Sequence, residues 1–307
     1  HAEVPLNIII EEENYELGIW GRADGIIIEE TVTIDEIKGV YLSLDLLEEP
    51  VKVHLAQAKC YAYIYGIQND LQKINVQMTY GNLDTGDLKY FSYEYSMQQL
   101  QEWFSDLILK YKKWADFQYE WRKKRQASIK ELAFPFPYRE GQKELAAGVY
   151  RTIARKKNLF IQAPTGVGKT ISTLYPAIKA VGEGLGDKIF YLTAKTVTAN
   201  VAKETLGILC EKGYRAKSVQ ITAKEKLCPC EEVDCNPVSC PYAKGHFDRV
   251  NDAVYELWTT EEVYSREVIR AHAEKWQVCP FEMCLDLSIW VDGIICDYNY
   301  VFDPNVH

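Results

Sequence analysis

The sequence predicts an α/β protein with two domains, and three observations support that prediction. Residues 1–95 show the pattern of five strands with one helix between the third and the fourth. After residue 133, apolar strand-like runs alternate with amphipathic helical segments, as in a parallel, doubly wound sheet. Two prolines in FPFPYREG end the long helical segment between these regions. We therefore expect a first domain in residues 1–132, including a helical linker, and a second in residues 133–307.

The composition is ordinary for a soluble protein with a sizeable core. The chain has 307 residues, of which 47% are hydrophobic and 26% charged. No apolar run approaches the roughly 20 residues that cross a bilayer, and the first residues lack the pattern of a signal peptide. A cytoplasmic protein without a membrane partner is expected. The net charge of −9 means that any contact with nucleic acid must be a local patch.

The elements of the first domain follow from alternating apolar residues. Strands are expected at VPLNIII, YELGIWGRADGIII, TVTIDEIKG, INVQMTYGNL and LKYFSYEY, and a helix at VKVHLAQAKCYAYIYGI. From residue 96 to about 132 the apolar spacing becomes helical and ends in the basic run WRKKRQASIK. We interpret this run as a solvated helix face that links two domains, in preference to a DNA-binding surface.

The second domain contains a glycine-rich loop between a predicted strand, Asn158–Gln162, and an amphipathic helix. The loop, APTGVGKT, resembles the P-loop that binds nucleotide phosphates. Its glycines let backbone N–H groups face the phosphates, and the helix N-terminus adds a positive dipole end. Lys169 is expected to reach the β and γ phosphates and Thr170 to hold Mg²⁺. The predicted ligand is ATP with Mg²⁺, bound by Thr165, Gly166, Val167, Gly168, Lys169 and Thr170.

Ala163 replaces the first glycine of the P-loop motif, and this substitution resembles motif I of superfamily 2 helicases. Two flanking segments extend that resemblance. Upstream, such helicases often place an adenine-reading element at positions matching Tyr138, Arg139 and Gln142. A polar helix start explains these residues equally well. Downstream, YLTAKTVTANVA resembles helicase motif Ia, whose hydroxyls and lysine would hold the phosphates of a single strand through Thr193, Lys195 and Thr196.

Six of the nine cysteines fall between Cys228 and Cys284. In a reducing compartment such clustering indicates metal binding in preference to disulfides. Four of them, Cys228, Cys235, Cys240 and Cys279, are the candidate ligands, and their long final arm differs from the paired CxxC knuckles of a compact zinc ribbon. Cys230 could stand in for Cys228, and thiolates bind both zinc and iron–sulfur clusters, so chemistry leaves the metal open. The remaining cysteines, Cys60, Cys210 and Cys296, have apolar neighbours and are expected in the core.

The order of these cysteines after motif Ia, with CPY and CPF, resembles the insertion of XPD-like and DinG-like helicases. The resemblance implies a [4Fe–4S] cluster with a structural role, held by the four cysteines in an insertion at residues 225–290. It also implies that ICDYNYVFDP precedes the DEAH motif, so that Asp297 is not the Mg²⁺-binding acid.

Five residues of the first domain match a nuclease pattern. GRADG places Asp24 near the end of one strand, and TIDEIKG places Glu36 and Lys38 on one face of the next, with Asp35 on the other face. On the following helix, Gln57 and Tyr61 are four apart and share a face. The set resembles the PD-(D/E)XK nucleases of the RecB-like branch. It implies two carboxylates that hold Mg²⁺ or Mn²⁺ and a lysine that orients water or stabilises charge.

Together the motifs resemble the front portion of an XPD/DinG-class DNA helicase fused behind a RecB-like nuclease. The resemblance implies 5′-to-3′ unwinding in DNA repair or processing, on single-stranded DNA or a duplex with a single-stranded end. The chain is expected to be a fragment that binds nucleotide weakly and does not unwind DNA alone. Two alternatives are a nuclease fold that only binds DNA, and a zinc-stabilised P-loop ATPase that acts on protein partners.

Overall fold

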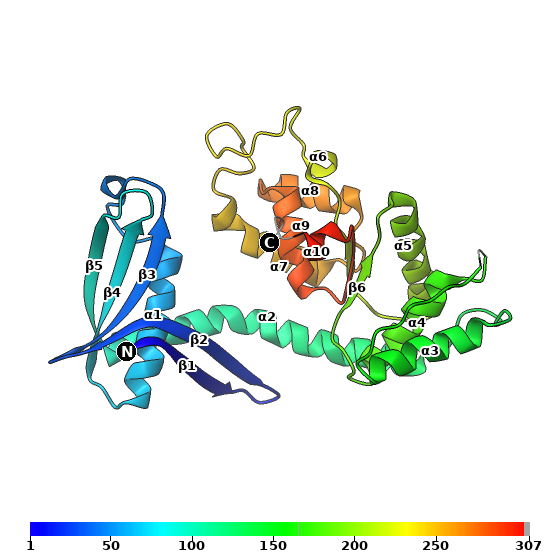
Figure 1. The fold of residues 1–307 in the computed structure, drawn as a ribbon, viewed down its shortest axis with the longest axis horizontal. Helices are drawn as coiled ribbons and strands as arrows, with labels where there is room; N and C mark the ends of the chain where they lie inside the picture. Colours follow the sequence, from blue (N-terminus) through cyan, green and yellow to red (C-terminus); the bar gives the residue numbers. More distant parts are fainter. Residues whose placement is uncertain (165, 304–307) are drawn as a thin grey trace. The chain divides into compact units, whose positions relative to one another are not determined.

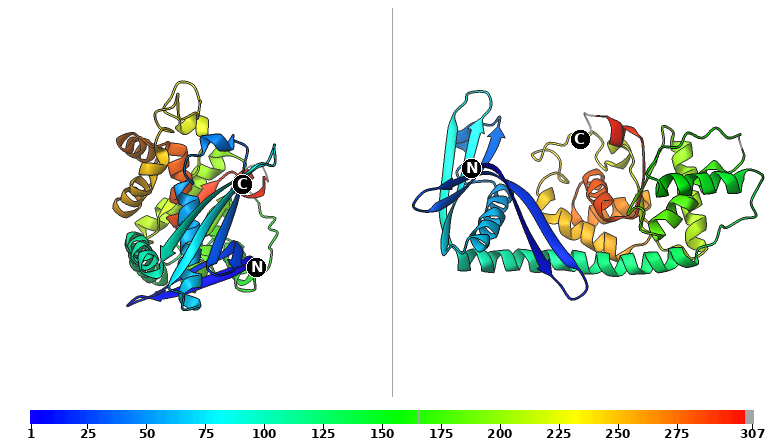
Figure 2. Two further views of the ribbon diagram at one scale, coloured as in Figure 1. Left: turned by 90° about the vertical axis from the view of Figure 1, so that its left-hand side faces the viewer. Right: turned by 60° about the horizontal axis from the view of Figure 1, so that its bottom comes forward.

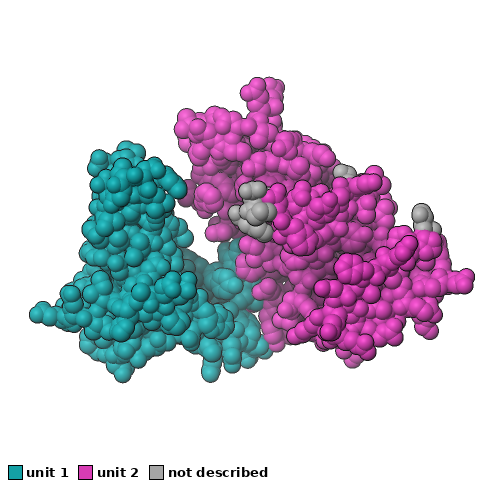
Figure 3. Space-filling view, in the orientation of Figure 1, with its two compact units in different colours: residues 1–115 teal, residues 116–307 magenta. Residues whose placement is uncertain are grey.

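The computed structural model describes residues 1–164 and 166–303. Its contacts divide the chain into two units, His1–Ala115 and Asp116–His307 (Figure 3). The division lies inside one long helix, α2 (Met97–Glu131), and not at residue 132 as expected from the sequence. The reason is that the second half of α2 buries Trp121 and Ile129. No helix in the described ranges combines the length and apolar character needed to cross a membrane.

The first unit is a mixed five-stranded sheet (Figure 1). Its strands are β1 (Ala2–Glu11), β2 (Glu16–Ile28), β3 (Val32–Val40), β4 (Lys73–Asn82) and β5 (Leu88–Ser96). They pair in chain order, and only β3 and β4 are parallel. A short 3-10 turn, η1 (Leu44–Leu46), and helix α1 (Lys52–Gln68) connect these two strands, because a parallel pair needs a crossover. All five expected strands and the helix are therefore present.

The core of the first unit lies between the sheet and two helices. Ile26, Ile34 and Ile74 of the sheet are fully buried, as are Ala58 and Ala62 of α1. The first turns of α2 close the same core, and there the rings of Tyr63 and Phe104 stack with centroids 4.3 Å apart. The packing fixes α1 against the sheet.

The second unit contains a small parallel sheet with helices around it. Its elements are α3 (Gln142–Ala154), α4 (Lys169–Gly182), β6 (Ile189–Leu192), α5 (Thr196–Glu211), β7 (Ser218–Gln220), α6 (Lys224–Leu227), α7 (His246–Thr260), α8 (Arg266–Trp276), α9 (Pro280–Trp290), β8 (Gly293–Cys296) and α10 (Asn299–Phe302). In the described part of the chain the sheet has the order β6-β8-β7, with both pairs parallel. The parallel sheet expected from the sequence is present in this small form.

One predicted strand is not formed. The segment Asn158–Gln162, ahead of the glycine-rich loop, pairs with no strand among the described residues. Its apolar side chains are open to solvent, and Phe160 is 96% exposed. A strand exists only through the hydrogen bonds of its neighbours, so an apolar run without a partner stays irregular.

The expected insertion is a helical segment between β7 and β8. Helices α7, α8 and α9 pack on one another around the fully buried Trp258 and Leu257. Helix α8 begins at Ser265, whose side chain accepts a hydrogen bond from the backbone N–H of Val268. Helix α9 begins with Pro280 directly after Cys279. The segment thus forms a layer of its own beside the parallel sheet.

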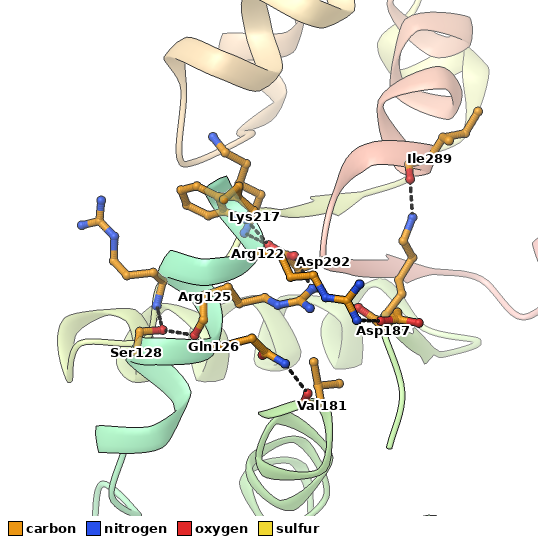
Figure 4. Close-up of polar contacts among 12 residues, drawn as sticks. Arg122, Arg125, Gln126, Ser128, Val181, Asp187, Lys217, Ile289 and Asp292 are labelled. Carbon is orange, nitrogen blue, oxygen red and sulfur yellow. Dashed lines mark hydrogen bonds and ion pairs between the residues drawn. The ribbon is translucent and has the colours of Figure 1, made fainter. Parts of the chain in front are cut away.

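Most of the basic run of α2 is exposed, as expected of a solvated face, but Arg125 is buried. Figure 4 shows Arg125 of α2 directed at Asp292, which directly precedes β8. Their ion pair is 2.6 Å long and both side chains are buried. Asp292 Oδ2 also accepts hydrogen bonds from Trp121 Nε1 and from the backbone N–H of Lys217, each at 2.8 Å. The second half of α2 is therefore part of the second unit. Figure 2 shows α2 as one continuous helix.

Candidate functional site

Neighbouring strands bring the two predicted acids of the first unit together. β2 and β3 pair with Gly25 opposite Asp35, so Asp24 and Glu36 are the next residues on each strand. Asp24 Oδ2 accepts a hydrogen bond of 2.9 Å from the backbone N–H of Ile37, which fixes its carboxylate. Burial raises the pKa of Glu36, and the charge of Asp24 adds to that rise. The two carboxylates therefore interact electrostatically.

Four of the predicted residues form a chain of hydrogen bonds from β3 to α1. Lys38 Nζ donates to Glu36 Oε1 at 2.7 Å and to Gln57 Oε1 at 3.2 Å. Gln57 Nε2 then donates to the hydroxyl of Tyr61 at 3.1 Å. The bond from Lys38 lowers the pKa of Glu36, against the larger effect of burial. The arrangement holds one ammonium group beside a buried carboxylate.

One carboxylate oxygen of Glu36, Oε2, accepts no hydrogen bond from the described residues. Its side chain is 1% exposed, and Oε2 is buried with no hydrogen-bond partner among the described residues. Buried polar atoms without partners are rare, and a bound ion is one explanation for them. Asp35, expected on the opposite face, accepts a hydrogen bond of 2.6 Å from Thr79 Oγ1. Of the consecutive acids Asp35 and Glu36, only Glu36 thus contacts Lys38.

Gly21 is a residue of this site that the sequence analysis missed. A Cβ at Gly21 would lie 2.4 Å from Cε1 of Tyr61, so the tyrosine ring rests on bare backbone of β2. Glycine in a strand interior often marks such a close approach, and this signal was present in the sequence.

His54 is the second missed residue. It lies on α1 one turn before Gln57, and its Nδ1 is 3.1 Å from the hydroxyl of Tyr80. That hydroxyl also accepts a hydrogen bond of 3.0 Å from the backbone N–H of Val51. Burial lowers the pKa of His54, and the charge of Lys38 adds to the effect. The spacing of three from Gln57 places both on one helix face and could have identified His54.

The glycine-rich loop of the second unit turns directly into α4. Gly166 and Gly168 have φ of 85° and 77°, which favour glycine, and the helix begins at Lys169. Lys169 Nζ donates to the carbonyl oxygens of Ala163 at 2.9 Å and Pro164 at 3.1 Å. Thr165 lies outside the described residues. Val167 and Thr170 are half-buried beside the glycines.

The upstream polar residues contact the loop. Gln142 is buried, its Oε1 accepts from the backbone N–H of Arg139, and its Nε2 donates to the carbonyl of Val167, both at 3.1 Å. The guanidinium of Arg139 donates to the carbonyl of Gly166. Both ends of the Gln142 amide are thus bonded within the chain, and contact with adenine requires these bonds to be exchanged. The role of Gln142 with nucleotide stays a prediction.

A cavity of about 290 Å³ lies at the carboxyl ends of β6, β7 and β8. Thr193 and Lys195 of the motif Ia segment line it, together with Gln220, Asp297 and Tyr300. Ligands of open α/β sheets bind at this edge. Asp297 Oδ1 accepts a hydrogen bond from the backbone N–H of Asn299, at the start of α10. Nothing is described for the side chain of Thr196.

The four predicted ligand cysteines line one cavity of about 200 Å³, which we call the cysteine cavity; they are Cys228, Cys235, Cys240 and Cys279. Cys230 is not among its lining residues, but burial and the neighbouring thiols of Cys228 and Cys240 together raise its pKa to about 11, so it lies close to both. Cys284 is fully buried in α9. Within the described ranges no three His, Cys, Asp or Glu side chains converge so that they could hold one ion.

The other three cysteines differ in their surroundings. Cys296 is buried and Cys60 is half-buried, but Cys210 is exposed, so its expected place in the core is wrong. Cys210 lies near the end of α5, two residues before its C-cap.

Fold and site together define a mixed α/β chain that carries a glycine-rich loop at a helix start. A scan against models of protein families finds no match. A protein of Methanocaldococcus jannaschii named "Probable ATP-dependent helicase MJ0942" is 51% identical over 51 residues, which are 16% of this chain and 8% of that protein. The similarity to a helicase is therefore partial and spans a small part of the relative's length. A solved structure described as "Crystal structure of SSO0001" matches 36% of this chain and 49% of its own chain at 21% identity, with a TM-score of 0.25.

Proposed function

We propose that this chain is part of an ATP-dependent DNA helicase, of 5′-to-3′ polarity by resemblance, coupled to a metal-dependent DNA nuclease in DNA repair or processing. The nuclease proposal is supported by the hydrogen-bonded series of Glu36, Lys38, Gln57 and Tyr61, with Asp24 beside Glu36. The short similarity to a helicase supports the motor assignment. The expected substrate is single-stranded DNA or a duplex with a single-stranded end.

The acids of the first unit fit a divalent cation. Asp24 and Glu36 would hold Mg²⁺ or Mn²⁺, and the unpartnered Oε2 of Glu36 supports this assignment. Mg²⁺ commonly binds through one or two carboxylates and keeps several waters, so two acids suffice. When bound, the ion would act as a Lewis acid on the scissile phosphate.

The chain's own residues would prepare the site for phosphate. Glu36 and Gln57 hold the ammonium of Lys38 in place, so that it can orient an attacking water or stabilise negative charge. Tyr61 fixes the amide of Gln57, and the backbone N–H of Ile37 fixes Asp24. Preorganised groups of this kind need little rearrangement during the reaction.

The second unit would bind ATP with Mg²⁺ and hold a [4Fe–4S] cluster. The positive-φ glycines and the start of α4 support phosphate binding at the loop. For the cluster, the support is that the four predicted thiols line one cavity. Thiolates bind both zinc and iron–sulfur clusters, and the preference for a cluster rests on the resemblance to XPD-like and DinG-like helicases.

The experiment is cleavage of linear DNA by the full chain with Mn²⁺. Glu36→Ala and Lys38→Ala are each expected to abolish cleavage. The matched control is Asp35→Asn, since Asp35 pairs with Thr79 on the opposite face of β3 and should leave cleavage intact. Cleavage that survives in all three variants would contradict the site. DNA binding without cleavage by the unchanged chain would favour a nuclease fold that only binds DNA.

A further inference from the structure

Two hydrogen-bond donors lie at the cysteine cavity beside the four thiols. The cavity is also lined by Lys224 of α6 and His246 at the start of α7. Neither residue belongs to the predicted ligand set. The contacts of each side chain show which of its N–H groups could donate a further hydrogen bond.

One ring nitrogen of His246, Nε2, is buried and has no hydrogen-bond partner among the described residues. The backbone N–H of Cys279 donates to His246 Nδ1 at 3.2 Å, so Nδ1 is the unprotonated nitrogen. The proton of a neutral ring is then on Nε2. The residue is 4% exposed, and Nε2 is buried without a hydrogen-bond partner among the described residues. A buried N–H in this state calls for an acceptor.

Lys224 places a cation among the thiols. Its Nζ lies 3.7 Å from Cys235 Sγ, 3.2 Å from Glu282 Oε1 and 5.0 Å from the ring centroid of Phe281. Four thiolates outweigh the charge of either a zinc ion or an oxidised [4Fe–4S] core, so the loaded site is anionic. A nearby ammonium offsets that charge where water is partly excluded.

We infer that Lys224 and His246 are positioning residues that donate hydrogen bonds to sulfur atoms of the metal group held by the four cysteines. The inference rests on the proposed metal site. Hydrogen bonds to the sulfurs of a cluster set its reduction potential and help to retain it. The cavity also offers the carboxylates of Asp234 and Glu282, and Lys224 Nζ lies within reach of both Glu282 Oε1 and Cys235 Sγ.

The test uses the anaerobically purified full chain and compares Lys224→Met and His246→Phe with the unchanged protein. Iron and acid-labile sulfide, the midpoint potential and the rate of iron release to a chelator are measured. Each variant is expected to shift the potential to a more negative value and to release iron several-fold faster. Lys224→Arg keeps a cationic donor, so its iron release should be nearly as slow as that of the unchanged protein. Lys244→Met is the matched control, because Lys244 is exposed and does not line the cavity.

The possible outcomes separate this inference from the proposed cluster. Iron and sulfide in the unchanged chain, with potentials and release rates unaltered in both variants, overturn the inference and leave the cluster standing. Zinc in place of iron overturns the cluster, and the same variants then test the donors through zinc release. A chain that binds neither metal overturns both. His246→Phe alone failing to fold leaves Lys224→Met and Lys224→Arg to decide.

Discussion

Arg125 in the second half of α2 and Asp292 ahead of β8 form a buried ion pair of 2.6 Å, although 167 positions separate them in the chain. The same carboxylate accepts hydrogen bonds from Trp121 Nε1 and from the backbone N–H of Lys217; Figure 4 shows Lys217 and Asp292 side by side. One acid therefore joins the helix to the starts of two strands, β7 and β8.

Arg125→Ala is expected to lower the free energy of unfolding by about 3–5 kcal/mol, because it leaves the charge of Asp292 buried without its main partner. The control is Arg122→Ala, whose pair with Asp187 is exposed. That change should cost less than about 1 kcal/mol. Urea unfolding followed by circular dichroism measures both, and equal losses would show that the buried pair has no special role.

Lys217 makes the stability depend on pH. Its side chain is 1% exposed, and Nζ lies 4.6 Å from the ring centroid of Trp121. Burial lowers the pKa of Lys217 from 10.5 to about 8. Between these two values the unfolded chain binds a proton that the folded chain does not. The contribution of Lys217 to stability therefore rises with pH in that window, by at most about 1.4 kcal/mol per pH unit.

The measurement is the unfolding free energy of the unchanged chain and of Lys217→Met between pH 7 and pH 9.5. Methionine keeps most of the volume and does not titrate. Relative to this variant, the unchanged chain should become more stable as the pH rises above about 8. A difference that stays constant over the range would mean that Lys217 keeps its proton in the folded state.

Gly21→Ala should disturb the first unit, since the added Cβ meets Cε1 of Tyr61 at 2.4 Å. We expect a loss of about 1–3 kcal/mol in the free energy of unfolding, typical of overpacking. Gly25→Ala on the same strand is the control, because its nearest contact is an ordinary 3.5 Å to Cβ of Asp35. If both variants unfold at the same urea concentration, Tyr61 does not rest on Gly21.

Gly168→Ala should weaken nucleotide binding about tenfold or more. The residue has φ of 77°, and a Cβ would lie 2.6 Å from Nε2 of Gln142, so the loop must distort. Gly148→Ala on α3 meets nothing within 4 Å and should leave the affinity unchanged. Fluorescence anisotropy with a labelled ATP analogue compares the three proteins. An unchanged affinity in Gly168→Ala argues against phosphate binding at this loop.

The features predicted correctly depend on local periodicity. A period of two places Glu36 and Lys38 on one face of β3, and helical spacing aligns Gln57 with Tyr61. Strand pairing of neighbouring segments then brings Asp24 beside them. Periodicity places the residues of each element on one face, whereas the grouping of β2, β3 and α1 into one site came from the resemblance to RecB-like nucleases, because Lys38 and Gln57 are 19 positions apart.

The features missed depend on contacts that are distant in sequence. The burial of Arg125 could not be foreseen, since its partner Asp292 belongs to a segment beyond the insertion. The contact of His54 with Tyr80 joins α1 to the next strand. The apolar run Asn158–Gln162 has the composition of a strand, but pairing, and not composition, makes one.

The order β6-β8-β7 has a consequence for how the protein is made. The central strand, β8, is the last of the three to leave the ribosome, and the whole helical insertion is synthesised before it. β6 and β7 have no shared neighbour until then. The helical insertion is therefore synthesised while the sheet is still open, and β8 joins β6 and β7 only after that interval.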